Sequence, residues 1–265
     1  MPGQYPTRTG LLAFFDILGY QNFILHSSIQ QSAWIIHEVI LKMPSLVRKA
    51  VIDKYSSVDR TFAEELEKCM SKPVIISDSI VWGFSFNPSL IERIQVQWLV
   101  FIEACCYLQR QMFDQGLPLR GAISYGEYFI EEGCLAGKPV VEAHDVGNKL
   151  DLVGCALTLQ AEKELPQRLD CGIDAFAGLV TDYAAPLKSF KPQNMKLLNW
   201  AFPGGTLLEP FGEDIRSRII EACSKHGKQI SSDVYPKVNN TEALLKHCKA
   251  AKQAWDAQNP APKSL

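Results

Sequence analysis

Apolar residues along this chain form either short continuous runs or stretches with helical spacing. Residues 10–17, Gly-Leu-Leu-Ala-Phe-Phe-Asp-Ile, are a short apolar run ending in a carboxylate, which predicts a buried central strand. After a turn at Leu18-Gly19-Tyr20, apolar side chains recur at helical spacing to about Val51, so we expect a long helical stretch there. A further helical pattern covers Arg60–Met70.

Two apolar runs on either side of Asp78 predict a β-hairpin. These runs are Val74–Ser77 and Ser79–Phe86. A helix should begin at Asn87-Pro88, because proline suits the first helical turn, and should run to about Asp114 before Gly116.

The remaining sequence continues the mixture of strands and helices. In chain order we expect a strand at 117–124 that residues 126–130 extend, helices at 140–153 and 156–165, strands at 179–183 and 194–200, and helices at 209–226 and 240–256. No repeat or convincing linker interrupts them. We therefore expect one α+β domain over residues 1–265, with a motif-bearing core at 10–160, the remaining strands and C-terminal helices at 161–258, and a disordered tail at 259–265.

Composition narrows the range of functions. The 265 residues are 47% hydrophobic and carry a net charge of −2, which argues against broad electrostatic binding to nucleic acid or anionic lipid. No apolar run has membrane-spanning length. The eight cysteines contain no C-x-x-C pair, and the first residues lack an apolar signal core. We therefore expect a cytoplasmic protein with reduced thiols that binds neither nucleic acid nor membrane.

Two carboxylates stand out as candidate chemistry. Asp16 ends the first strand, and Asp78 lies in an Asp-Ser turn, which is a poorer hairpin turn than Asn-Gly. Each alone could be only a turn former or a helix N-cap. If the first strand pairs with the hairpin, however, both side chains enter one space, where they repel unless a cation joins them. Two Mg²⁺ or Mn²⁺ ions suit such a pair and could activate an attacking oxygen and stabilise a leaving one.

Three stretches resemble motifs of class III nucleotidyl cyclases. They are Phe14-Phe15-Asp16-Ile17-Leu18-Gly19-Tyr20, Ile76-Ser77-Asp78-Ser79-Ile80, and Leu119-Arg120-Gly121-Ala122-Ile123-Ser124-Tyr125-Gly126. That family carries Phe-x-Asp-Ile-x-Gly-Phe, Gly-Asp and Arg-x-Gly-Ile-x-x-Gly in this order. The similarity spans roughly residues 10–160 and looks most like the pyrimidine cyclases of bacterial anti-phage systems.

The resemblance implies a ferredoxin-like α+β fold with a central, mostly antiparallel sheet flanked by helices. It also implies a head-to-tail homodimer with active sites at the subunit interface. Asp16 and Asp78 would hold both metal ions, helped by the carbonyl of Ile17. The triphosphate would be held by the backbone amides of Leu18, Gly19 and Tyr20.

The implied reaction is attack of the ribose 3′-oxygen on the α-phosphorus of UTP or CTP. It yields cyclic UMP or cyclic CMP plus pyrophosphate, and a separate effector protein would respond to the cyclic product. Positioning and charge neutralisation would supply most of the catalysis.

The sequence departs from the family at the nucleotide. Purine cyclases carry a base-reading lysine four residues before the second metal-binding aspartate, and this chain has Val74 there. Losing that purine contact favours a pyrimidine. Ser77 stands where the family has glycine, and we assign Val74 and Ser77 to the nucleotide-binding residues.

A second departure concerns the family's Asn-x-x-x-Arg helix, which holds ribose and phosphate. Its positions align with Val141 and Asp145, and a shifted alignment starting at Asn148 puts Leu152 where arginine belongs. Arg120 is our candidate for the missing group, because its guanidinium can grip a phosphate or a base carbonyl. The alternative is a solvent-exposed arginine at a strand end.

Three other functions fit parts of the pattern. The missing Asn-x-x-x-Arg motif suits a non-catalytic, cyclase-like domain that binds a nucleotide or a protein partner. A purine nucleotide cyclase would keep both aspartates. A diguanylate cyclase or polymerase palm also uses two carboxylates, but the chain lacks the Gly-Gly-Asp/Glu-Glu-Phe hairpin, and its low basic balance argues against nucleic-acid substrates.

Overall fold

The computed structural model describes residues 5–87, 93–131, 133–167, 178–202 and 211–258. Its strands are β1 (Arg8–Ile17), β2 (Val74–Ile76), β3 (Ser79–Ser85), β4 (Leu119–Glu131), β5 (Cys134–Ala136), β6 (Gly154–Leu157), β7 (Val180–Leu187) and β8 (Phe190–Leu198). Its helices are α1 (Tyr20–His26), α2 (Ile29–Ile35), the π-helix η1 (Ile36–Ile40), α3 (Met43–Ser56), α4 (Arg60–Cys69), α5 (Ile94–Asp114), α6 (Lys138–Lys149), α7 (Leu159–Gln167), α8 (Ile215–Ser224), the 3₁₀ turn η3 (Lys225–Gly227) and α9 (Tyr235–Gln258).

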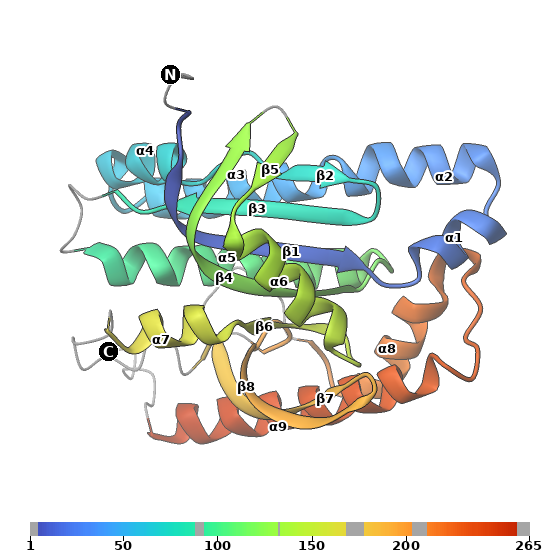
Figure 1. Cartoon of the computed structure of the whole chain (residues 1–265). Coiled ribbons are helices and arrows are strands. Elements are labelled where there is room, and N and C mark those ends of the chain that lie inside the picture. Colours follow the sequence, from blue (N-terminus) through green and yellow to red (C-terminus); the bar gives the residue numbers. More distant parts are fainter. Residues whose placement is uncertain (1–4, 88–92, 132, 168–177, 203–210, 259–265) are drawn as a thin grey trace.

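The strands build one sheet with the order β2-β3-β1-β4-β6-β8-β7, and β5 pairs with β4. All described pairs are antiparallel except β4 with β6. Along the chain, the elements from β1 to β4 follow the β-α-β-β-α-β order of a ferredoxin-like core, with several helices between β1 and β2. The expected α+β class, with a mostly antiparallel sheet flanked by helices, is confirmed (Figure 1).

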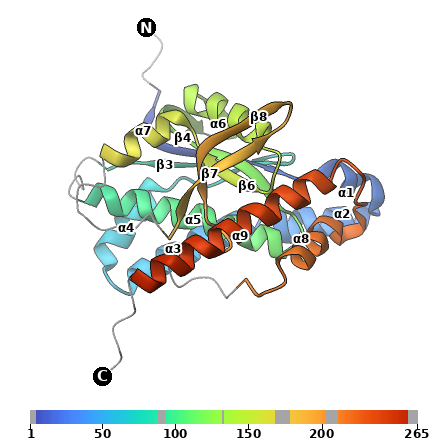
Figure 2. The same ribbon diagram turned by 90° about the horizontal axis from the view of Figure 1, so that it is seen from below.

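Strand β1 lies in the middle of this core and is buried on both faces, as its apolar run predicts. Leu11, Phe15 and Ile17 pack into the main core on the side of α3, α4 and α5. Leu12 and Phe14 point to the opposite face, against α6. Figure 2 shows these helices on the two sides of the sheet. Asp16 follows the same alternation, so its side chain belongs to the α6 face.

The C-terminal elements extend the core instead of forming a separate layer. The β7–β8 hairpin continues the sheet beyond β6, and α9 packs against β7 and α8. Figures 1 and 2 both place α8 beside α1, so the end of the chain returns to the region where β1 ends. Among the described helices, none is long and apolar enough to cross a membrane.

Several sequence predictions differ from the structure. The long helix after Gly19 is broken at Ser27-Ser28, where the Ser28 hydroxyl accepts from the amide of Gln31 and a new helix starts. The predicted helix 156–165 begins only at Leu159, because residues 154–157 pair with β4 as a parallel strand. The predicted helix starts at 87–88 and 209, and the tail 259–265, fall partly or wholly outside the described residues.

Candidate active site

A cavity of about 340 Å³ opens where β1 ends. One side comes from the β1–α1 turn, the β2–β3 turn and the start of β4, and the other side comes from residues 223–237. Its lining includes Asp16, Asp78 and Arg120. Residues from three distant parts of the sequence therefore meet around the two carboxylates.

Backbone pairing fixes the relative position of these three residues. Asp16 lies opposite Ser79 of β3 on one side and opposite Arg120 of β4 on the other. The amide of Ile17 donates to the carbonyl of Asp78 at 2.9 Å, which ties the β2–β3 turn to the end of β1. The turn itself is tight, since Ser77 adopts a left-handed φ of 58°.

The electrostatics of Asp16 reflect two opposing effects. Burial raises the pKa of Asp16, and the negative charge of Asp78 raises it further, whereas Arg120 lowers it through its charge and its hydrogen bond. The guanidinium Nη2 of Arg120 lies 2.8 Å from Asp16 Oδ2, and the two side chains are 6% and 24% exposed. The candidate arginine is thus a buried ion-pair partner of Asp16, which excludes the solvent-exposed alternative.

Asn148, on helix α6, also binds Arg120. This contact was not predicted from the sequence. Arg120 Nη2 donates to Asn148 Oδ1 at 3.1 Å, and Asn148 Nδ2 donates to His144 Nε2 at 2.8 Å. The Nε of Arg120 is buried and has no hydrogen-bond partner in the described part of the chain. The i, i+4 spacing of His144 and Asn148 was the available signal, but only the fold shows that Asn148 reaches Arg120.

Close packing of α6 on β4 makes this contact possible. A Cβ added to Gly147 would lie 2.9 Å from Gly121 Cα, so only two glycines allow the backbones to approach this closely. Val141 and Asp145, the positions aligned with the family's Asn and Arg, are both exposed. Neither lines the cavity.

The predicted phosphate-binding amides need one correction. The amide of Leu18 donates to the carbonyl of Pro118 at 2.9 Å, so strand-end pairing already uses this donor. Gly19 has a left-handed φ of 75°, which turns the chain into α1. Within the described residues the amides of Gly19 and Tyr20 have no acceptor. Ile17, Leu18, Gly19 and Tyr20 all line the cavity, whereas Val74 and Ser77 do not.

Lys228 is a second residue that sequence reasoning missed. Its side chain is buried, and its Nζ donates to the carbonyls of Gly116 and Ala222. Burial lowers the pKa of Lys228 from 10.5 to about 8. The lysine thereby connects residues near the ends of α5 and α8, and a Cβ added to Gly19 would lie 3.2 Å from its Cδ.

The oxygen atoms at the end of β1 provide some of the ligands that a hard divalent cation needs. Two carboxylates and the carbonyl of Ile17 are oxygen ligands of the kind that Mg²⁺ and Mn²⁺ take. Oδ2 of Asp16 is used by Arg120, which leaves Oδ1 for a metal ion. No group of three or more His, Cys, Asp or Glu side chains suited to a metal exists among the described residues. Oxygens from water and from a bound phosphate would complete the coordination.

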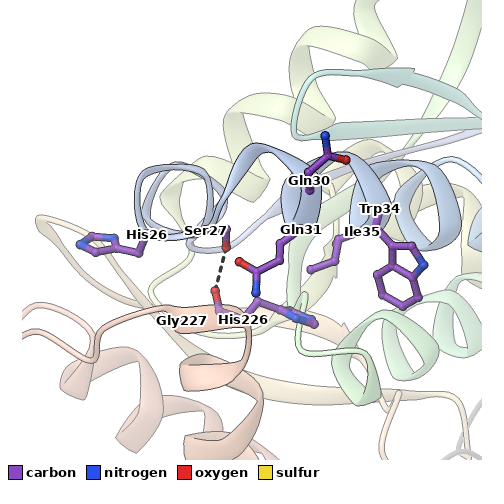
Figure 3. Close-up of a pocket in the computed structure, with 8 residues that line it drawn as sticks. All are labelled: His26, Ser27, Gln30, Gln31, Trp34, Ile35, His226 and Gly227. Carbon is purple, nitrogen blue, oxygen red and sulfur yellow. Dashed lines mark hydrogen bonds between the residues drawn. The ribbon is translucent and has the colours of Figure 1, made fainter.

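A larger cavity of about 530 Å³ lies nearby between α1–α2 and η3 (Figure 3). His26, Gln30, Gln31 and Trp34 line it on one side and His226 on the other. Its described lining has no Asp, Glu, Lys or Arg. It offers no carboxylate pair and no lysine or arginine for a metal-bound triphosphate, and we assign the candidate site to the smaller cavity.

Comparison with known proteins finds similar proteins only among solved structures. No family model matches the sequence, and no curated protein does. A bacterial light-regulated adenylyl cyclase is similar with 12% identity and a TM-score of 0.42 over 73% of this chain and 90% of that chain. The catalytic core of a rhodopsin-guanylyl cyclase with converted specificity, in complex with ATPαS, is also similar. Its sequence identity is 12% and its TM-score is 0.43, over 74% of this chain and 98% of that chain. A class III adenylyl cyclase-like ATP-binding protein from Pseudomonas aeruginosa has 12% sequence identity and a TM-score of 0.43. The match covers 96% of this chain and 44% of that chain, so this chain spans less than half of that protein.

Proposed function

We propose that this protein is a nucleotidyl cyclase that converts a nucleoside triphosphate to a 3′,5′-cyclic monophosphate and pyrophosphate. The observation that carries the proposal is the meeting of Asp16 and Asp78 in one cavity, held together by the Ile17–Asp78 backbone bond. Both belong to sequence motifs that resemble class III cyclases. In this proposal they and the Ile17 carbonyl bind two Mg²⁺ or Mn²⁺ ions.

Such ions would supply charge neutralisation at the phosphates and acidity to the attacking hydroxyl. The protein's own groups have separate tasks in the proposal. Asp16 and Asp78 bring the metals and the reacting α-phosphate together. The amides of Gly19 and Tyr20 and the guanidinium of Arg120 donate to phosphate oxygens as negative charge develops.

We propose a pyrimidine substrate, UTP or CTP, for this reaction. Val74 stands where purine cyclases carry a base-reading lysine, and this difference supports the choice. Following the same resemblance, the enzyme would work as a head-to-tail homodimer. Its product would activate a separate effector in anti-phage defence.

The test is incubation of the purified protein with each of the four nucleoside triphosphates and Mn²⁺, followed by chromatographic identification of cyclic products. We expect cyclic UMP or cyclic CMP, and we expect Asp16→Asn and Asp78→Asn to abolish it. Asp182→Asn is the matched control, because Asp182 is 82% exposed and pairs only with Lys196 among described residues. No cyclic product from any triphosphate, or a product that survives Asp16→Asn, would refute the proposal. A cyclic purine product would reject the substrate choice alone.

One observation favours a second candidate, a nucleotide-binding domain without catalysis. Arg120 pairs with Asp16 and takes one of its carboxylate oxygens, which would compete with a metal ion. This candidate predicts that triphosphate binds without Mn²⁺ and is recovered unchanged. Metal-dependent turnover would exclude it.

A further inference from the structure

The wall of the cavity that faces the two carboxylates comes from a part of the chain outside the cyclase-like motifs. The residues that line this wall are Lys228, Gln229, Ser231, Asp233, Val234 and Lys237. They connect η3 to the first turn of α9. The same chain that carries Asp16 and Asp78 therefore also forms this wall of their cavity.

This wall is anchored to the N-terminal half by specific hydrogen bonds. Ser27 Oγ donates to the carbonyl of His226 at 3.1 Å, a bond that Figure 3 shows. The amide of Gln229 donates to Asn22 Oδ1 at 2.9 Å, and the His226 ring donates to the carbonyl of Gln115 at 2.6 Å. Residues 226–229 are thus fixed against α1 and the end of α5.

The two lysines of the wall differ in what they can bind. Lys228 Nζ is buried and donates to two backbone carbonyls, so its role is structural. Lys237 Nζ donates to the carbonyl of Asp233 at 2.9 Å and lies 3.7 Å from Asp151 Oδ1, with both side chains 23% exposed. At 3.7 Å the Lys237 ammonium makes no direct hydrogen bond to Asp151, so it can turn to a stronger anion.

Other positive charges lie near Lys237. Burial and the charges of Arg120 and Lys237 lower the pKa of Lys188 in the β7–β8 turn, whereas Asp16 and Asp151 raise it. Arg120 and Lys237 both line the cavity, whereas Lys188 does not line it. Cations gathered beside a carboxylate pair form a site for a polyanion with bound metal, where the metal faces the carboxylates and the remaining charge faces the lysines.

We propose that Lys237 binds the polyphosphate tail of the substrate in the same subunit that carries Asp16 and Asp78. This proposal rests on the proposed function for the nature of the substrate. It assigns a task to the C-terminal region, which completes the phosphate site through α9. It also supplies phosphate-binding charge in a chain that lacks the arginine of the family's Asn-x-x-x-Arg helix.

The experiment measures binding of inorganic tripolyphosphate by isothermal titration calorimetry, without nucleotide or metal. We expect Lys237→Met to weaken binding at least tenfold and Lys237→Arg to restore most of it. The matched control is Lys246→Met on the same helix, because Lys246 is 65% exposed and pairs with Glu242. It should change affinity less than twofold. Circular dichroism melting of each variant verifies that it is folded.

The outcomes separate this inference from the proposed function. If tripolyphosphate binds and Lys237→Met weakens it while no triphosphate is cyclised, the lysine site stands and the cyclase proposal falls. If the protein makes a cyclic nucleotide and Lys237→Met leaves both the tripolyphosphate affinity and the KM for triphosphate unchanged, the lysine site is wrong and the cyclase proposal stands. Absence of tripolyphosphate binding by the unaltered protein would also overturn the lysine site.

Discussion

Replacing Arg120 with methionine should destabilise the protein through the carboxylate it leaves behind. Methionine keeps the apolar part of the side chain but removes the cation 2.8 Å from Asp16. Burial and the charge of Asp78 would still act on Asp16, and both already raise its pKa. Removing one partner of a buried ion pair costs about 3–5 kcal/mol. Since Asp16 is 24% exposed, we expect the lower end, about 3 kcal/mol at pH 8.

The pH dependence has a definite sign. A carboxyl whose folded pKa lies above its unfolded value binds more protons when folded, so stability falls as pH rises from the unfolded pKa through the folded one. Losing Arg120 removes the main group that lowers the pKa of Asp16 and leaves only the smaller effect of Lys188, so this dependence grows. The cost of Arg120→Met should therefore be smaller at pH 5 than at pH 8. Adding Asp16→Asn should restore stability to within about 1 kcal/mol of the parent protein, because no buried charge is then left unpaired.

Urea unfolding followed by tryptophan fluorescence measures these differences, since Trp82, Trp98 and Trp200 are fully buried reporters. Arg60→Met is the control, because Arg60 is 87% exposed and pairs only with its helix neighbour Glu64 among described residues. It should cost less than about 0.5 kcal/mol. Equal losses for Arg120→Met at pH 5 and pH 8, together with no rescue by Asp16→Asn, would refute the ion-pair account.

Three further predictions concern stability. The pKa of Lys228 falls from 10.5 to about 8 on folding, so the unfolded chain binds more protons than the folded chain between these pH values. The unfolding free energy of the parent protein, relative to that of Lys228→Met, should therefore rise by about 2 kcal/mol from pH 8 to pH 10. A free-energy difference that does not change with pH would contradict the buried ammonium. Gly147→Ala should cost about 1–3 kcal/mol in urea unfolding, because its Cβ would meet the backbone of Gly121 at 2.9 Å, and a neutral result would show that α6 can move away. Ser77→Gly should raise the melting temperature through a gain of up to about 1 kcal/mol, since glycine adopts the φ of 58° without strain, and a loss would mean that the hydroxyl has a structural role.

Local pattern was enough to predict many elements. The helix expected over Arg60–Met70 is found at Arg60–Cys69, and the hairpin around Asp78 is found with a two-residue turn. The central strand is two residues longer at its start than expected. Each of these elements has a strong helical periodicity or a continuous apolar run in its own sequence. Its secondary structure could therefore be predicted without knowing which elements it packs against.

The errors arose where tertiary contacts decide the structure. A short apolar run such as residues 154–157 fits a buried strand or a buried helix equally well, and its parallel partner β4 makes it a strand. The break at Ser28 depends on a capping hydrogen bond within a sequence that otherwise has helical spacing.

The candidate site divides in the same way. Asp16 and Asp78 could be found because each stands at the end of an apolar run. Asn148 was noted only as an alignment position, and neither Lys228 nor Lys237 had any local signal. Their roles come from contacts across 28, 112 and 86 positions of the chain: Arg120 with Asn148, Gly116 with Lys228, and Asp151 with Lys237.

The position of β1 has a consequence for the newly made chain. Both of its neighbours, β3 and β4, follow it in the sequence, and β4 begins only at Leu119. Until then an emerging polypeptide carries an apolar strand with one open edge, which is the kind of segment that associates with other chains. Protection by a chaperone near the ribosome, or slow growth at low temperature, should therefore improve the yield of folded protein more than changes to its surface.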